Sequence, residues 1–520
     1  MRDFNLSELI IALSIANLLF SPVWRERIYY TAPVYHVKYF PTQIEYISLI
    51  VSVVFLAAVF AAAVRTARYF NNGKTPVSIK IIFLAIVLTA LGIMGTVIIK
   101  TQFWIVTAIG RRTFLIASML AAAAIFILAV VFYRKAFTVA RTLMLIFSPF
   151  ILVTFSQAVI KAVNASDLVE ETSELQPFTV SSEPKPAIKA RVVWLIFDEL
   201  DYRAAFEIRP PDVRMPEFER LRAESVFASQ AAPPANDTLD SIPSLLLGRK
   251  VVGPKTVGKN ELHLRYADSG EQIEFGKTAN VFSDVKQMGG DTALVGWYHP
   301  YCRVIGESLS GCLWETRDVW HDFPSEGFFG AVNKNFEVVF NSLPDAVRSK
   351  FSEDRRYISR HERMFDAALK VTQNQDVDLS LIQFTVPHYP YRYNRLKNDF
   401  SGGESYLDNL ALTDNILGQI RRGLEEKGLW DETVVIVSSD HPLRMRRKDV
   451  LTPKDLEFTG GVQDTRVPFI VKLKNQKNNL NYDKPFNTVV TRELINLLMK
   501  GEISTPGEVA EWLDTKSEKN

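Results

Sequence analysis

Acidic and histidine residues follow three apolar segments of the sequence. The segments are VVWLIF, LIQFTVP and TVVIVSS, and they are followed by Asp198 and Glu199, by His388, and by Asp440 and His441, respectively. Buried strands that end in carboxylate and imidazole groups predict a metal site at a sheet edge. These ligand types suit Zn²⁺ or Mn²⁺. The alternative for each aspartate taken alone is a turn former or a helix cap.

A hydroxyl group stands at the predicted start of a helix. In the segment PPANDTLDSIPSLLLGR, Thr238 precedes an apolar run with helical spacing. The free N–H groups at a helix N-terminus favour a phosphate or sulfate group and its developing charge. A hydroxyl becomes an effective nucleophile when a metal or a base activates it. Thr238 is therefore a candidate nucleophile. The alternative is that Thr238 caps the helix, a role that Asp237 could also fill.

The elements that must position these residues lie in the region 190–520, which has the composition of a soluble domain. The predicted strands are 192–197, 379–386, 433–439 and 467–473, and the predicted helices include 217–225, 361–372 and 404–427. Continuous β-branched runs separated by amphipathic helices predict an α/β domain whose mainly parallel sheet is covered by helices on both faces. In such sheets, functional groups gather where strands end.

The N-terminal region differs sharply from this domain. It contains five long apolar runs, at 6–23, 46–64, 77–99, 114–132 and 143–162. Each approaches the roughly 20 residues that cross a bilayer. We therefore predict a five-helix transmembrane domain over 1–163, a polar linker over 164–189 and a catalytic domain over 190–520. A cleaved signal peptide is the alternative for the first run alone.

Composition and charge exclude several classes of protein. The 520 residues are 47% hydrophobic and 23% charged, with a net charge of +2 and two cysteines. A disordered chain and a four-cysteine zinc cluster are excluded, and a nucleic-acid partner is not expected. Basic residues of the second and fourth loops are predicted to be cytoplasmic, which places the C-terminal domain outside the cytoplasm.

Taken in chain order, these segments resemble the alkaline phosphatase/sulfatase superfamily. The likeness is most specific to its membrane-anchored phosphoethanolamine and phosphoglycerol transferases, of the lipoteichoic acid synthase type. The matching segments are VVWLIFDE, TLDSIP followed by SLLLGR, VPHYPY, YLDNLALTDNILGQI, VVIVSSDH and RVPFIV. They cover most of 191–473, and the predicted anchor also matches these transferases.

The resemblance implies a role for each matching residue. The implied ligands of one divalent metal ion, Zn or Mn, are Asp198, Thr238, Asp440 and His441. Thr238 would also be the nucleophile, and His388 would contact the substrate phosphate or assist proton transfer. Glu199 is an additional candidate ligand, and Arg466 a candidate for supporting the site.

The sequence also departs from these families. The Cys-x-Pro-x-Arg sequence, in which sulfatases modify a Cys or Ser to formylglycine, is absent, which argues against an ordinary sulfatase. Phosphoethanolamine transferases of the lipid A type usually carry several disulfides, one beside the nucleophile. Here Ser244 occupies the place of that cysteine, and Pro442 follows His441 in place of the common glycine.

Three further features have a functional and a structural interpretation. Cys302 and Cys312 are expected to form a disulfide if the domain is extracytoplasmic, the alternative being two free thiols. The neighbouring segment WYHPYCR contains His299, which could line an acceptor pocket near the metal or belong to an aromatic packing cluster. The tyrosines around His36, in the first outer loop, are typical of an interfacial aromatic belt.

These observations predict an enzyme of the bacterial inner (plasma) membrane with a periplasmic or extracytoplasmic catalytic domain. It would transfer phosphoethanolamine or phosphoglycerol from a membrane phospholipid to a glycan or glycolipid acceptor through a phospho-threonine intermediate. The first alternative is a phosphodiesterase or sulfatase-like hydrolase on the same fold. The second is a non-catalytic membrane binding module.

Overall fold

The chain forms two compact units, each built from segments that are separate in the sequence. The computed structural model describes residues 6–28, 34–38, 40–101, 111–165, 175, 187–316, 327–342, 351–447 and 450–517. The helical unit comprises 1–31, 39–170 and 323–351. The sheet unit comprises 32–38, 171–322 and 352–520. Most of the predicted linker, 164–189, lies outside the described residues.

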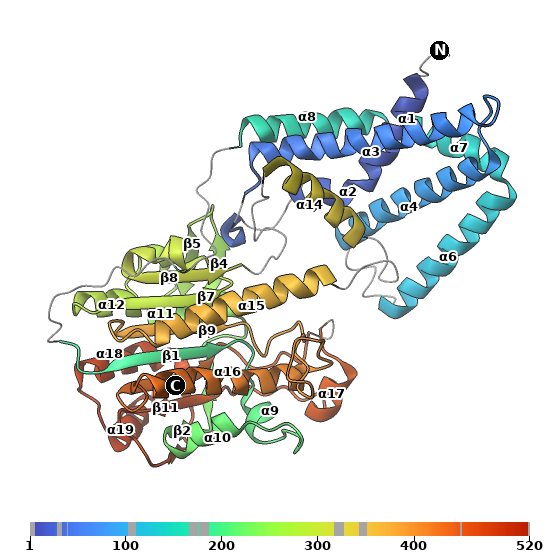
Figure 1. Cartoon of the computed structure of the whole chain (residues 1–520). Helices are drawn as coiled ribbons and strands as arrows, with labels where there is room; N and C mark the ends of the chain where they lie inside the picture. Colours follow the sequence, from blue (N-terminus) through green and yellow to red (C-terminus); the bar gives the residue numbers. More distant parts are fainter. Residues whose placement is uncertain are drawn as a thin grey trace. The chain divides into compact units, whose positions relative to one another are not determined.

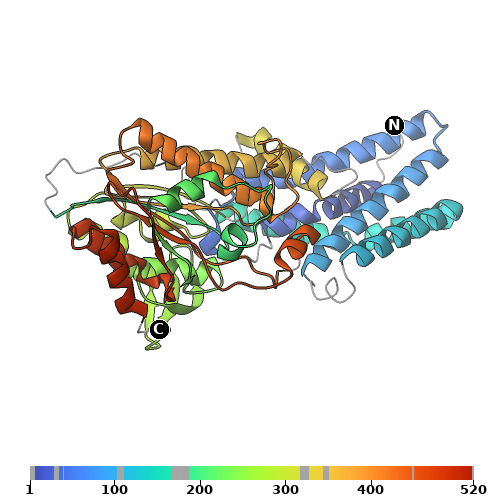
Figure 2. The ribbon, with the colours of Figure 1, turned by 90° about the horizontal axis from the view of Figure 1, so that it is seen from below.

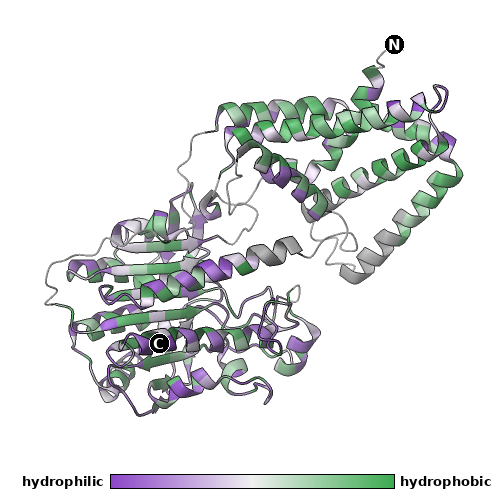
Figure 3. Ribbon diagram, viewed as in Figure 1, coloured by the Kyte–Doolittle hydropathy of each residue, from purple (hydrophilic) through white to green (hydrophobic). Residues whose placement is uncertain are grey.

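The helical unit consists of long apolar helices (Figures 1 and 3). Its helices are α1 (Leu6–Leu19), α2 (Ser21–Arg27), α3 (Gln43–Tyr69), α4 (Val77–Thr101), α6 (Arg111–Val131), α7 (Tyr133–Ile146), α8 (Pro149–Val163) and α14 (Gly327–Asn341). A capping box between Thr42 and Glu45 fixes the start of α3. Pro22 lies in the first turn of α2, where its missing N–H is tolerated and a new helix can start.

The structure supports fewer membrane spans than the five predicted. Among the described residues, three helical segments are long and apolar enough to cross a membrane: Gln43–Tyr69, Val77–Gly95 and Tyr133–Val163. The helices α1 and α2 would add a fourth span if they act together, although they are bent by 58°. The predicted run 114–132 coincides with α6, many of whose side chains lie outside the described residues. The number of five membrane spans therefore remains a prediction.

The sheet unit is built on one eight-stranded, mainly parallel sheet, as predicted (Figure 1). In spatial order its strands are β12 (Leu480–Tyr482), β2 (Val226–Ala228), β11 (Phe469–Lys472), β10 (Thr433–Ser439), β1 (Arg191–Phe197), β9 (Leu379–Phe384), β7 (Thr292–Trp297) and β8 (Gly311–Glu315). Only β11 among these strands is antiparallel to its neighbours. β1 lies at the centre, between β10 and β9, and is parallel to both.

Helices cover both faces of this sheet (Figures 1 and 2). Alternate side chains of β1 point to opposite faces, so that Trp194 belongs to one buried cluster and Leu195 to the other. The first cluster is completed by α11 (Thr238–Leu247), α12 (Val281–Gln287), α18 (Thr491–Lys500) and α19 (Pro506–Ser517). The second is completed by α10 (Pro216–Ala223), α15 (Phe351–Thr372) and α16 (Tyr406–Glu426). Burial on both faces explains the continuous apolar runs of the central strands.

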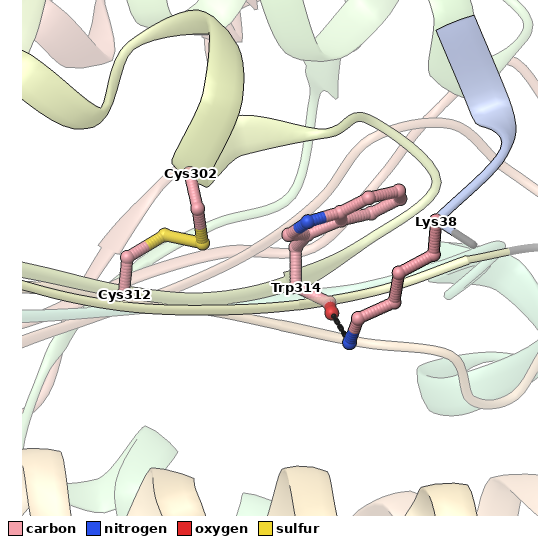
Figure 4. The surroundings of a disulfide bond; sticks show 4 residues. All are labelled: Lys38, Cys302, Cys312 and Trp314. Atoms are coloured by element: carbon pink, nitrogen blue, oxygen red, sulfur yellow. Dashed lines mark hydrogen bonds between the residues drawn. A yellow bond between two sulfur atoms is a disulfide. The ribbon is translucent and has the colours of Figure 1, made fainter. Parts of the chain in front are cut away.

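A disulfide links the outermost strand of the sheet, β8, to a short helix. Cys302, in α13 (Tyr301–Val304), is bonded to Cys312 in β8 (Figure 4). The bond closes the short loop between α13 and β8, which is the pairing expected for an extracytoplasmic domain. The described residues contain no free cysteine.

We expect loss of this disulfide to lower the free energy of unfolding by about 2–3 kcal/mol, because an open loop gains entropy in the unfolded chain. Urea unfolding of the full-length protein in detergent, followed by tryptophan fluorescence, would compare the wild type with the Cys302→Ser/Cys312→Ser variant. Wild type treated with a reductant provides the control, and it should match the variant. An unchanged unfolding midpoint in both would contradict this expectation.

Candidate functional site

The central strands bring the predicted site residues together at the carboxyl ends of the strands. Phe197, the last residue of β1, pairs with Ser439 of β10 and with Phe384 of β9. Asp198 continues β1, and its backbone N–H donates to the carbonyl of Phe384 at 3.0 Å. Asp440 continues β10 in the same register. Because parallel neighbouring strands end together, the residues that follow them are placed side by side.

Two carboxylates and one imidazole converge at these strand ends. Candidate ligand atoms of Asp198, Asp440 and His441 all lie within 4.8 Å of one another. His441 Nε2 is 3.5 Å from Asp198 Oδ1 and 3.6 Å from Asp440 Oδ2. All three side chains are fully buried. This combination of oxygen and nitrogen donors suits a divalent cation such as Zn²⁺ or Mn²⁺.

Carboxylate oxygens without hydrogen-bond partners point to the same conclusion. Among the described residues, no group donates a hydrogen bond of good geometry to either oxygen of Asp198 or to Oδ2 of Asp440, although the Trp297 side chain interacts with Asp198. Burial, together with the nearby charges of Asp440 and Glu199, raises the pKa of Asp198 well above its usual range. Buried charges are normally paired or bound to metal. A bound cation would supply the missing positive charge, so the residues present fit a metal site.

Hydrogen bonding leaves His441 ready to act as a ligand. Its Nδ1 lies 3.0 Å from the carbonyl oxygen of Pro442, which can only accept a hydrogen bond. Nδ1 therefore carries the proton, and Nε2 presents a lone pair to the two aspartates. The backbone carbonyl of residue 442 thus selects this tautomer.

Thr238 has its hydroxyl directed at the same cluster. Asp237 is the N-cap of α11, since its side chain accepts from the backbone N–H of Asp240, and Thr238 is the first helical residue. The alternative that Thr238 caps the helix is therefore wrong. Its Oγ1 lies 3.4 Å from Nε2 of His441. Ser241 joins α11 to the end of β10 through a 2.6 Å hydrogen bond to the carbonyl of Asp440.

His388 lies in the loop that follows β9, next to Asp198. Its backbone N–H donates to the carbonyl of Asp198 at 3.1 Å. Asn409 of α16 holds the loop by donating to the carbonyl oxygens of Pro387, His388 and Pro390. The His388 Nδ1 donates to the carbonyl of Tyr389, which leaves Nε2 as an acceptor. Burial lowers the pKa of His388, which favours this neutral ring.

Arg444 is a site residue that the sequence reasoning did not identify. Its Nε donates to Oε1 of Glu199 at 2.8 Å, and its Nη2 donates to Nε2 of His388 at 3.1 Å. Glu199 is thus brought to the site but is held by Arg444. Although burial opposes ionisation, the positive charge of Arg444 and its hydrogen bond keep the pKa of Glu199 below its usual value. Glu199 also has a left-handed backbone, with φ of 66°. The basic segment that follows His441 indicated a cation near the site but did not show which of its arginines would reach Glu199.

We expect Arg444→Gln to reduce turnover by about 10- to 100-fold, because it leaves Glu199 without its cation and His388 without its donor. Arg444→Lys, which keeps the charge but not the two-point contact, should fall between this variant and the wild type. Steady-state kinetics with a phosphodiester substrate would measure both. Equal activity of the glutamine variant and the wild type would show that Arg444 has no part in the reaction.

The two remaining candidates lie away from the convergent side chains. Arg466 makes ion pairs with Glu207 and Asp464 and packs on the ring of Tyr202. His299 is fully buried, so it does not line an open acceptor pocket. Its Nε2 instead contacts the backbone carbonyl of Thr238 at 3.2 Å. Its ring packs against those of Tyr35, Phe275 and Tyr301, which agrees with the alternative of an aromatic packing cluster.

Comparison with known proteins identifies one protein family. The sulfatase family model matches residues 191–492. No curated protein matches the sequence. Solved structures with a similar fold include a Bacteroides thetaiotaomicron sulfatase, BT33336S-sulf, with 15% identity, coverage of 64% of this chain and 82% of that chain, and a TM-score of 0.44.

Two further solved structures have a similar sequence identity and lower TM-scores. The lipoteichoic acid synthase LtaP from Listeria monocytogenes has 14% identity, covering 64% of this chain and 79% of that chain, with a TM-score of 0.37. The phosphonate monoester hydrolase of Agrobacterium radiobacter has 14% identity, covering 58% of this chain and 72% of that chain, with a TM-score of 0.35.

Proposed function

Because this chain belongs to the sulfatase family, we propose that its buried site carries out metal-dependent phosphoryl-group transfer. The substrate would be a membrane phospholipid, and the transferred group phosphoethanolamine or phosphoglycerol. The acceptor would be a hydroxyl of a glycan or a glycolipid. A hydrolase that uses water as the acceptor is the alternative on the same fold.

The observation that carries this proposal is the position of the Thr238 hydroxyl. It lies 3.4 Å from His441 Nε2, which is itself 3.5 Å from Asp198 Oδ1, and it stands at the start of α11. Formylglycine forms from Cys or Ser, so a threonine keeps its hydroxyl as the nucleophile. The N-terminal N–H groups of α11 favour the negative charge of a phosphate at this place.

The residues of the chain account for both steps of a transfer. In the first, the Thr238 Oγ1–phosphorus bond forms, the bond from phosphorus to the diacylglycerol oxygen breaks, and the Thr238 proton is passed on to that oxygen. In the second, the acceptor oxygen attacks phosphorus, the threonine ester breaks, and the acceptor proton returns to Thr238. His388 is the candidate proton carrier, because its Nε2 carries no proton; that nitrogen accepts from Arg444 and would exchange this hydrogen bond for the transferred proton.

Four residues would hold the metal ion: Asp198, Thr238, Asp440 and His441. When bound, the ion would lower the pKa of the Thr238 hydroxyl and neutralise phosphate oxygens. The remaining contribution of the chain is to hold the reacting groups in line, with Asp440 and His441 fixed by backbone hydrogen bonds.

Two observations outside the site support a lipid substrate at an extracytoplasmic surface. The helical unit contains three or four segments able to cross a membrane, which would keep the enzyme at the lipid surface. The Cys302–Cys312 disulfide is typical of proteins in oxidising compartments.

The test is to place the full-length protein in liposomes that contain phosphatidylethanolamine or phosphatidylglycerol with a labelled head group. Release of diacylglycerol, with the label transferred to an added glycolipid or glycan, is the expected result. Diacylglycerol with free labelled head-group phosphate in the presence of acceptor would instead identify a hydrolase. No diacylglycerol from either lipid, with the metal site loaded, would contradict a phospholipid donor.

A further inference from the structure

A short segment from the N-terminal part of the chain belongs to the sheet unit. Residues 34–38, called here the strap, lie between α2 and α3 in the sequence, and both of those helices are in the helical unit. The strap begins with a 3-10 turn, Val34–His36. Tyr35, Val37 and Lys38 are buried. The interpretation of this region as an interfacial aromatic belt is therefore wrong for the strap.

The strap is held by a dense set of hydrogen bonds from the sheet edge. Arg303 donates to the carbonyl oxygens of Tyr35 and Val37, at 2.7 and 2.8 Å. Lys38 Nζ donates to the carbonyl of Trp314 at 2.7 Å, and this contact lies beside the disulfide in Figure 4. Because Arg303 directly follows Cys302, the disulfide holds the turn that carries the strap's main donor.

His299 connects the strap to Thr238 by two hydrogen bonds. Tyr35 Oη lies 3.0 Å from His299 Nδ1, and His299 Nε2 lies 3.2 Å from the backbone carbonyl of Thr238. A carbonyl oxygen accepts only, so Nε2 must carry the proton. Nδ1 is then the acceptor, and the Tyr35 hydroxyl must be the donor. The Tyr35 hydroxyl thus donates to His299, and His299 donates to the carbonyl of Thr238, the first residue of α11.

Because these side chains are buried, leaving a polar atom of either one without its hydrogen-bond partner would cost free energy. Tyr35 and His299 are both fully buried. Removing the Tyr35 hydroxyl would leave the His299 Nδ1 without its donor, and the ring would lose one of its two fixed points. The carbonyl of Thr238 belongs to the same residue as the hydroxyl that faces His441, so a shift of one moves the other.

We propose that the strap positions the Thr238 nucleophile, with Tyr35 and His299 as positioning residues, so that the sheet unit needs the segment 34–38 for full turnover. This inference rests on the proposed role of Thr238. It implies that turnover by the sheet unit depends on a segment that a soluble form beginning after residue 164 would lack.

The test compares Tyr35→Phe and His299→Phe, singly and together, in the full-length protein. Tyr482→Phe is the matched control, because Tyr482 is also a buried tyrosine, and its hydroxyl contacts Asp514 at 3.0 Å. The substrate is bis(4-nitrophenyl) phosphate, which needs no lipid; Thr238 displaces 4-nitrophenolate in the first step, and water attacks phosphorus in the second and frees Thr238. We would measure kcat, KM and bound metal per chain, together with diacylglycerol release from phospholipid.

We expect Tyr35→Phe to lower kcat by about tenfold or more with unchanged KM and metal content, because misplacement affects the reaction more than binding. The double variant should lose no more than His299→Phe alone, since both act through the same two hydrogen bonds. Tyr482→Phe should match the wild type. A kcat for Tyr35→Phe equal to that control, or losses that multiply in the double variant, would overturn the proposal. Normal diester turnover without diacylglycerol release would overturn the lipid substrate alone and leave this comparison valid.

Discussion

Replacing Thr238 by alanine is expected to reduce turnover by roughly 10⁴- to 10⁶-fold, the range typical of losing a catalytic nucleophile. Alanine has no oxygen to form the covalent ester. The fold should be preserved, because Asp237 rather than Thr238 caps α11. We expect the free energy of unfolding to change by less than about 1 kcal/mol. Turnover and urea unfolding of the full-length variant measure the two effects separately.

Two further variants sharpen this comparison. Thr238→Ser keeps a hydroxyl and should retain measurable turnover. Thr413→Ala is the matched control, because Thr413 is a buried threonine whose hydroxyl donates to the α16 backbone, at the carbonyl of Asn409. It should keep nearly full activity. Turnover by Thr238→Ala above about a tenth of the wild-type rate would mean that another group is the nucleophile.

The second large effect concerns the metal site. We expect chelator treatment to abolish turnover, and Asp198→Asn to weaken metal binding by more than about 100-fold, since even indirect supporting residues contribute 10- to 100-fold. Metal content per chain after dialysis against Zn²⁺ or Mn²⁺ measures this directly. Asp240→Asn is the control, because Asp240 lies on α11 outside the convergent group. Full metal content in Asp198→Asn would contradict the proposed ligand set.

The raised pKa of Asp198 adds a pH dependence with a defined sign. A carboxyl group whose pKa is higher in the folded than in the unfolded protein favours folding below that folded pKa, and this contribution is lost as the pH rises through it. Metal-free wild type should therefore lose stability relative to Asp198→Asn as the pH rises. Bound metal should reverse the order, because it needs the ionised carboxylate. The test is to measure the unfolding midpoints of both proteins, with and without metal, as the pH rises from the ordinary pKa of an aspartate to above the raised pKa of Asp198.

The parts of the site that follow strands could be predicted from the sequence for a local reason. An apolar run ending in an acid, such as VVWLIF before Asp198, places that acid at a strand end whatever the rest of the chain does. Parallel pairing of β1 with β10 then brings Asp198 to Asp440 and His441 without further information. The same reasoning found Thr238 because a helix start is also encoded locally.

The other parts depend on contacts between distant segments. Arg444 is recognisable only once Glu199 and His388 are near it, and nothing in its own segment distinguishes it from the arginines that follow. The strap is more remote still, since Tyr35 and His299 are 264 positions apart. β7 and β8 were also not predicted. β7 contains Gly296, whose missing side chain leaves room for Tyr301 and which interrupts its apolar run.

The most direct test is the mass of the peptide that contains Thr238 after brief incubation with phospholipid. The full-length protein in liposomes would be mixed with head-group-labelled phosphatidylethanolamine or phosphatidylglycerol without acceptor, quenched in acid and digested. The account predicts that the label, as phosphoethanolamine or phosphoglycerol, is attached to Thr238, and that Thr238→Ala abolishes it. Diacylglycerol release with no label on Thr238, or label on another residue, would contradict it.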